Sequence, residues 1–161
     1  MRKALFSLGA MFFESRLCPD GVSAQNLLGV AIKVVTTQDH LPITSKSSAD
    51  WCRTRKPLSS QAEQLAGLAF LIDGALSFVP LMHDHKFLDD AAACSSLDFA
   101  LRIFADDFDL NTWHLKEYTT TIANGGLTYS EGGLWDAHGA MVASMTQHNI
   151  LRPKKGTGAN L

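Results

Sequence analysis

The sequence predicts an α+β fold in which an antiparallel sheet of about five strands curls around one long central helix. Three observations lead to this prediction. One apolar segment has helical spacing, the hydrophobic period changes from near 3.6 to 2 after residue 90, and short turn signals separate the later apolar segments.

The helix is expected to begin at a capping box, because Ser60 is followed three residues later by Glu63. Apolar residues then recur at helical spacing at Leu65, Leu68, Ala69, Ile72, Ala75, Leu76 and Val79. Pro80 is expected to end the helix. Since most of the helix surface is apolar, other elements should wrap it.

Four strands are predicted after the helix. Leu97, Phe99, Leu101 and Ile103 alternate with more polar residues, and further strands are predicted over residues 113–123, 127–135 and 140–151. The sequence Asn124-Gly125-Gly126 indicates a hairpin, and residues 136–139 a tight turn.

The segment before the helix is less regular. It is predicted to contain short strands over residues 4–13 and 51–56, a strand or short helix over 27–37, and a linker over 39–49. One strand, a helix and then four hairpin-connected strands give the layout of the hotdog fold.

Composition limits the function classes. The 161 residues are 46% apolar and 19% charged, which suits one domain with a core and excludes wholesale disorder. A net charge of -2 leaves no basic excess to neutralise phosphates, so no nucleic acid partner is expected.

The most apolar stretch, residues 65–82, contains Asp73 and predicts a buried helix rather than a membrane span, which needs about 20 apolar residues. The basic and apolar N-terminus is a poor secretory signal, because its apolar run is short and no cleavage site follows.

No metal or other cofactor is expected. Cys18, Cys52 and Cys94 match no metal spacing and are predicted to be reduced and packed. The triplet His83-Asp84-His85 has no further ligands nearby in sequence. The terminal Gly156-Thr157-Gly158 lacks the strand and helix of a phosphate loop.

Three polar residues are candidates for a site. Asp73 lies within the apolar helix, where a buried carboxylate costs several kcal/mol unless it is paired. It either serves function or lies on an exposed edge of the helix. Ser96, predicted to share a strand face with Asp98, and Gln147, near the polar end of the last strand, fit either a site or an ordinary strand surface.

Several ordered motifs then carry a resemblance. They are Ser95-Ser96-Leu97-Asp98-Phe99-Ala100-Leu101, Phe108-Asp109-Leu110-Asn111-Thr112-Trp113, Asp136 to Gly139, Val142-Ala143-Ser144-Met145-Thr146-Gln147, and Leu151-Arg152. Together they resemble the C-terminal half of the acyl-CoA thioesterase II family, over roughly residues 49–152. Members of this family contain two hotdog units in one chain.

The resemblance implies a catalytic trio of a helix Asp, a Ser or Thr at the start of the next strand, and a Gln on the last strand. Asp73, Ser96 and Gln147 fill these positions. The sequence departs from the family beside them. Phe99 replaces a His, Ile72 replaces a Ser, and residues 102–104 read Arg-Ile-Phe instead of Trp-Phe-His. These changes bear on substrate choice and on catalytic competence.

Family members are nearly twice as long as this chain. The resemblance therefore implies that residues 1–48 are a remnant strand of a first hotdog unit plus a linker, that 49–152 are the hotdog thioesterase domain, and that 153–161 are a flexible tail. A unit without its neighbour exposes a sheet edge and an apolar face, so a homodimer or higher oligomer is expected.

The expected activity is hydrolysis of fatty acyl-CoA to free fatty acid and CoA. No Ser–His pair is evident in the sequence, so direct attack by water is expected, with Asp73 as general base and Ser96 and Gln147 holding the water. Backbone N–H groups near the helix would stabilise the oxyanion, and the acyl chain would lie between hotdog units. The alternatives are a non-catalytic or partner-dependent truncated unit, and a tailoring thioesterase of a secondary-metabolite pathway.

The last residues suggest a location. Ala159-Asn160-Leu161 keeps the small first residue and the terminal Leu of the peroxisomal tripeptide but lacks its basic middle residue. The expected location is the peroxisome, with the cytoplasm as the alternative.

Overall fold

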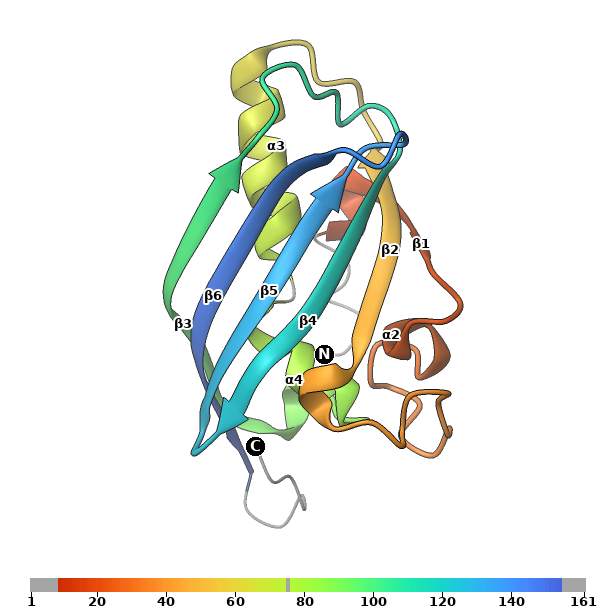
Figure 1. Cartoon of the computed structure of the whole chain (residues 1–161), viewed down its shortest axis with the longest axis vertical. Coiled ribbons are helices and arrows are strands. Elements are labelled where there is room, and N and C mark those ends of the chain that lie inside the picture. Colours follow the sequence, from red (N-terminus) through yellow and green to blue (C-terminus); the bar gives the residue numbers. More distant parts are fainter. Residues whose placement is uncertain (1–8, 75, 155–161) are drawn as a thin grey trace.

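A computed structural model describes residues 9–74 and 76–154, and it confirms the α+β class. One antiparallel six-stranded sheet has the order β1-β2-β4-β5-β6-β3, and helix α3 lies against one of its faces (Figure 1). The strands are β1 (Phe13–Leu17), β2 (Ser47–Thr54), β3 (Ala91–Ile103), β4 (His114–Asn124), β5 (Leu127–Trp135) and β6 (Met141–Pro153). The helices are α2 (Val22–Gln25), α3 (Gln61–Asp73) and α4 (Val79–His83), with 3₁₀ turns at Ile43–Ser45, Leu76–Phe78 and Leu88–Asp90.

Helix α3 begins as predicted but ends earlier. The Ser60 hydroxyl accepts a hydrogen bond from the Glu63 amide at 3.2 Å, and the Glu63 carboxylate accepts one from the Ser60 amide at 3.1 Å. Gly74 has an extended backbone, with φ -60° and ψ 114°, and it ends the helix at Asp73. The prediction that Pro80 ends the helix is wrong, because Pro80 lies in the first turn of α4, where a missing N–H breaks no helical hydrogen bond.

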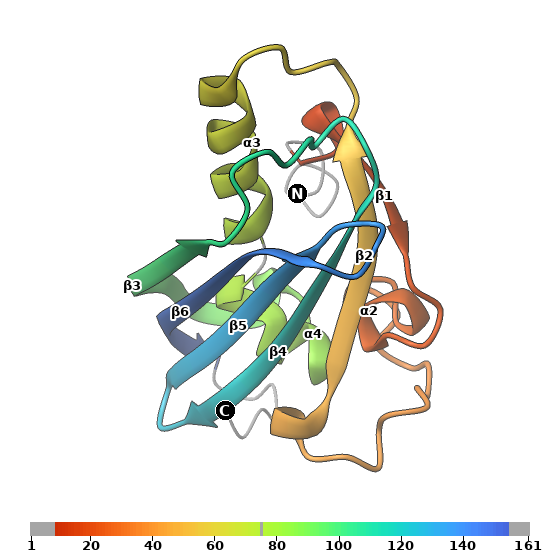
Figure 2. The same ribbon diagram turned by 45° about the horizontal axis from the view of Figure 1, so that its top comes forward.

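The sheet covers only one side of α3 (Figure 2). Leu68, Leu71 and Ile72 are buried and join the core that the inner face of the sheet provides. On other faces of the helix Leu65 and Phe70 keep 39% and 42% of their surface exposed. The expectation that other elements wrap this helix is therefore wrong over those faces.

The hairpin between β4 and β5 forms at the predicted Asn124-Gly125-Gly126 turn. Gly125 and Gly126 have φ values of 63° and 78° between β4 and β5, a conformation that favours glycine. Between β3 and β6 a bulge leaves Leu97 as an extra residue. Ser96 is paired with Asn149, and Asp98 with His148.

The bulge corrects one prediction. Since His148 and Asn149 are consecutive in β6, they point to opposite faces of the sheet, and so do their partners Asp98 and Ser96. Ser96 and Asp98 therefore do not share a face. Ser96 lies on the face of the buried Asn149, which is the helix side of the sheet.

The N-terminal segment adds the sixth strand. Residues 9–12 are helical, so the strand predicted over 4–13 is wrong in its described part, and β1 instead starts at Phe13 and pairs with β2. Arg16 and Arg53 both lie over the ring of Trp113, at 4.3 and 4.6 Å from its centroid. Cation–π contacts thus tie β1 and β2 to the residue that precedes β4. Residues 27–37 form turns rather than a strand or a helix.

Buried hydrogen bonds fix the long connection between β1 and β2. The Ser23 hydroxyl donates to the Ser48 hydroxyl at 2.9 Å, and Ser48 Oγ lies 2.9 Å from His83 Nε2. The Lys46 ammonium donates to the His83 carbonyl at 2.9 Å. These bonds join α2, β2 and α4.

The stretch Gln61–His83 is long and apolar enough to cross a membrane by length and composition alone. About half of the most apolar 18-residue part of this stretch, 47%, is buried inside the protein. The stretch is not one helix, because it is divided between α3, a 3₁₀ turn and α4. A core helix passes the same test, so this remains weak evidence for a span. Cys18, Cys52 and Cys94 are free thiols, as predicted.

We expect His83 to make folding sensitive to acid. Burial, followed by the nearby Lys46 charge, lowers the pKa of His83 from its ordinary value to about 4. Between about pH 6.5 and 4 the unfolded chain therefore binds a proton that the folded chain does not, so stability falls as the pH falls. From pH 7 to 5 wild type should lose about 2 kcal/mol more than His83→Gln in urea unfolding. Equal losses in the two proteins would contradict this prediction.

Candidate functional site

Asp73 and Gln147 form one hydrogen-bonded pair. Gln147 Nε2 donates to Asp73 Oδ1 at 2.8 Å, which joins the last residue of α3 to the middle of β6. Asp73 itself is exposed, so its carboxylate is both positioned and accessible to solvent. The alternative that Asp73 lies on an exposed edge of the helix is confirmed, and the residue is also paired with Gln147.

Gln147 is held in a buried polar row across the sheet. It is 1% exposed, and β-pairing places it opposite Ser130, which in turn lies opposite Thr120. The hydroxyls of Thr120 and Ser130 are 3.4 Å apart. The sequence-based alternative that Gln147 is a surface amide is therefore wrong.

Two buried acceptor atoms in this region have no hydrogen-bond partner among the described residues. They are Gln147 Oε1 and Asn149 Oδ1. The Asn149 amide donates to Thr128 Oγ1 at 3.4 Å and to the Gln147 carbonyl at 3.2 Å. Because an unpaired buried acceptor costs free energy, such atoms mark a place where water or a ligand donor can bind.

Ser96 lies near this pair without touching it. It is exposed on β3, on the same face as Gln147, and its register partner is Asn149. Within the part of the chain that the structure describes, its hydroxyl makes no hydrogen bond to Asp73 or Gln147. The catalytic roles expected for the three residues remain predictions, and the structure joins two of them, Asp73 and Gln147, at the end of α3.

Sequence reasoning missed the polar row. Thr128 and Ser130, and likewise Gln147 and Asn149, stand two residues apart on one strand. This spacing places each pair on one face. The spacing was visible in the sequence, but only the sheet pairing shows that this polar face is the buried one.

Sequence reasoning also missed a Ser–His pair, Ser48 and His83, which the structure shows at hydrogen-bond distance. Both side chains are buried, at 1% and 0% exposure. The Ser48 hydroxyl is also bound by Ser23, and the lowered pKa of His83 makes it a weak base. A nucleophile must reach its substrate, so this pair belongs to the core rather than to a catalytic site.

The predicted site carries no metal ligand set. In residues 9–74 and 76–154 no group of three or more His, Cys, Asp or Glu side chains is placed to hold an ion. His85 binds Asp39 at 2.7 Å. Desolvation alone would raise the pKa of Asp39, but hydrogen bonds from His85 and Thr36 hold this pKa well below its usual range. The triplet around residue 84 is thus used in packing and ion pairing.

The site can orient a water molecule. A carboxylate with one oxygen held by an amide keeps its remaining lone pairs available as proton acceptors. The unpaired Gln147 oxygen beside it can accept a second hydrogen bond. This arrangement suits general-base chemistry on a water without a covalent intermediate.

Solved structures of other proteins share this fold. An acyl-CoA thioesterase II, TesB2, from Mycobacterium marinum is 20% identical, with a TM-score of 0.67 over 91% of this chain and 52% of that one. A hotdog-fold protein from Alicyclobacillus acidocaldarius is 14% identical, with a TM-score of 0.58 over 88% and 46%. A Streptococcus mutans protein bound to acetyl CoA is 12% identical, with a TM-score of 0.53 over 70% and 86%. These likenesses establish the hotdog fold.

The chain spans about half the length of the first two of these proteins. No protein of curated function matches it. Residues 19–151 match the family described as the acyl-CoA thioesterase C-terminal domain. Because this match covers most of the chain, and because the fold agrees, the chain belongs to the acyl-CoA thioesterase C-terminal domain family.

Proposed function

We propose that this protein hydrolyses fatty acyl-CoA thioesters to a free acid and CoA. The observation that carries the proposal is the Asp73–Gln147 hydrogen bond, which presents a fixed carboxylate at the open end of α3. Membership of the acyl-CoA thioesterase C-terminal domain family supports thioester hydrolysis as the reaction class. The Streptococcus mutans structure, which is similar in fold, is bound to acetyl CoA and so supports a CoA thioester as the ligand.

In the proposed reaction a water molecule attacks the thioester carbonyl. Asp73 accepts a proton from the water as the new C–O bond forms, and the C–S bond then breaks as the leaving sulfur takes that proton from Asp73. Gln147 fixes the carboxylate through Nε2 and accepts a hydrogen bond from the water at Oε1. Ser96, exposed on the same face, can bind the water or the carbonyl oxygen.

Phe99 makes this site more apolar than the family pattern predicts. It lies opposite Gln147 in the β3–β6 pairing and is 62% exposed. An aromatic ring at this place favours an alkyl chain over a charged group. The proposed substrate is therefore a fatty acyl thioester, in a housekeeping or a tailoring role.

Replacing Asp73 tests the mechanism. Asp73→Asn keeps the size of the side chain but removes its basic oxygen, so acyl-CoA hydrolysis measured by thiol release should fall about 100-fold or more. Asp98→Asn is the matched control, because Asp98 lies on the opposite face of β3 and should leave the rate within twofold. Full activity in Asp73→Asn would remove this residue from the mechanism.

We also propose that the active form contains a second hotdog unit, supplied by another copy of this chain. Strand β3 is an edge strand of 13 residues, and the large apolar side chains Leu97, Phe99, Ile103 and Phe104 on it or after it are exposed. An uncovered edge with apolar side chains is a template for pairing. The same edge borders the site, so a partner-dependent or inactive single unit is the second candidate function.

Association can be measured directly. Light scattering should give a mass of at least twice 17.5 kDa. Phe104→Glu places a charge at this apolar edge and should shift the protein toward the monomer at equal concentration. Ile122→Glu is the control, since Ile122 is exposed on β4, which β5 and β6 separate from the β3 edge. A wild-type monomer with full hydrolytic activity would refute the requirement for a second unit.

The peroxisomal location stays a proposal. The tail tripeptide that suggests it, Ala159-Asn160-Leu161, lies outside the described residues. A reporter protein carrying residues 150–161 at its C-terminus should enter peroxisomes, and deletion of Leu161 should return it to the cytosol. A diffuse signal from the intact tail would refute the proposal.

A further inference from the structure

An apolar cavity of about 530 Å³ lies between α3 and the N-terminal segment, and the site around Asp73 does not include it. Its apolar wall is formed mainly by Met11, Phe12, Phe13, Leu58, Gly67 and Phe70. The Phe70 ring packs against Phe12 at 5.7 Å and against Phe13 at 6.1 Å between centroids. The volume falls within the range of about 300–1,000 Å³ found for small-molecule sites.

The shape of the wall follows from residue size. Glu63, Ala66, Gly67 and Phe70 recur at helical spacing, so they share one face of α3, away from the buried Leu68 and Ile72. The small side chain of Ala66 leaves room beside the helix. A side chain at Gly67 would come within 3.0 Å of Leu58 and 3.2 Å of Leu110, so the helix packs closely at this point.

Two charged side chains stand at the cavity, and only one of them is free. The Glu63 carboxylate is committed to the start of α3, where it accepts hydrogen bonds from the amides of Ser59 and Ser60. Lys56 is exposed and, among the described residues, pairs with no acidic side chain. An apolar cavity with an available cation is complementary to a ligand with an alkyl chain and one negative charge.

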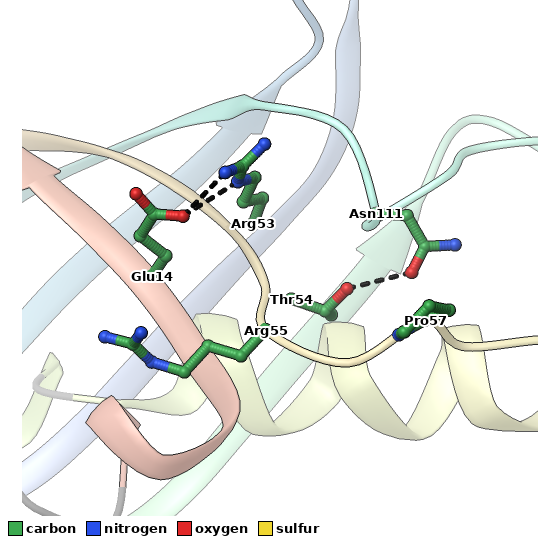
Figure 3. A pocket seen from close by; sticks show the side chains of 6 residues that line it. All are labelled: Glu14, Arg53, Thr54, Arg55, Pro57 and Asn111. Carbon is green, nitrogen blue, oxygen red and sulfur yellow. Dashed lines mark hydrogen bonds and ion pairs between the residues drawn. The ribbon is translucent and has the colours of Figure 1, made fainter.

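The neighbouring polar cavity does not compete for this role. It has a volume of about 280 Å³ and shares Thr54 with the apolar cavity (Figure 3). Arg53 there is bound by Glu14 through two hydrogen bonds, at 2.9 and 2.8 Å. Arg55 donates from Nε to the carbonyl oxygens of Ala10 and Phe13. Its cations are engaged in holding β1, which leaves Lys56 as the anion partner.

We infer that this cavity binds a free medium-chain fatty acid, with its alkyl chain against Phe12, Phe13 and Phe70 and its carboxylate at Lys56. The inference does not depend on the proposed hydrolysis, because none of Asp73, Ser96 and Gln147 lines the cavity. Since both sites use α3, an acid bound here contacts the helix one turn before Asp73.

Calorimetric titration of the full chain with dodecanoate, below its micellar concentration, tests the inference. One molecule per chain should bind, and decanoate should bind about 15-fold more weakly, because each buried methylene contributes about fourfold. Lys56→Glu should weaken dodecanoate about fivefold while leaving uncharged dodecanol within twofold. Lys33→Glu, at an exposed lysine outside the cavity, should leave both ligands within twofold.

Two tryptophan variants locate the ligand. Ala66→Trp fills the cavity from an exposed helix position and should abolish binding of both dodecanoate and dodecanol. Ala62→Trp, on the same helix but outside the lining residues, should not. Circular dichroism will show that both variants are folded.

The outcomes are separable from those of the hydrolysis test. Dodecanoate should bind Asp73→Asn as tightly as wild type; binding lost in Asp73→Asn, or kept in Ala66→Trp, would place the acid elsewhere and overturn the inference. Absence of binding in a wild type that hydrolyses acyl-CoA would overturn the inference alone. Binding in a wild type without hydrolysis would overturn only the proposed function.

Discussion

The structure depends on one packing contact, that of the Leu68, Leu71 and Ile72 face of α3 against the inner face of the sheet. A 13-residue helix is marginal in water by itself, so its stability comes from this burial. Within residues 9–74 and 76–154, the other elements that pack on the inner face of the sheet, the 3₁₀ turn Leu76–Phe78 and α4, are short. Helix and sheet are therefore stable only together, and every functional feature is placed relative to their contact.

The same contact brings Asp73 to Gln147. Burial of Ile72 fixes the rotation of the last helical turn, and Gly74 stops the helix one residue after Asp73. The carboxylate thus leaves the helix beside the middle of β6, where the amide of Gln147 meets it. Ser130 and Thr120 continue a polar row across the sheet from the buried Gln147. A carboxylate that is exposed at one side and hydrogen-bonded at the other is both accessible and positioned, which is what general-base chemistry requires.

Because the sheet covers one side only, two apolar regions stay open. One is the edge strand β3 with Leu97, Phe99 and Ile103, and the other is the cavity between α3 and the N-terminal segment. They differ in shape. The edge presents unpaired backbone along a run of exposed apolar side chains, which suits another strand. The cavity is a pocket that opens to solvent and carries Lys56, which suits a small amphiphile.

The sequence alone determined the features that arise from local chemistry. Periodicity, the Ser60–Glu63 capping box and the Asn124-Gly125-Gly126 turn predicted the helix start, the hairpins and the α+β class, and ordered motifs singled out Asp73, Ser96 and Gln147. Tertiary structure decided the rest. It ended the helix at Asp73 and not at Pro80, because a proline is tolerated in the first turn of a new helix. It turned Ser96 and Asp98 to opposite faces through a bulge set by pairing with β6, and it buried the polar face of β5 and β6. Pairing register and sidedness come from contacts between residues far apart in the chain, which no local pattern contains.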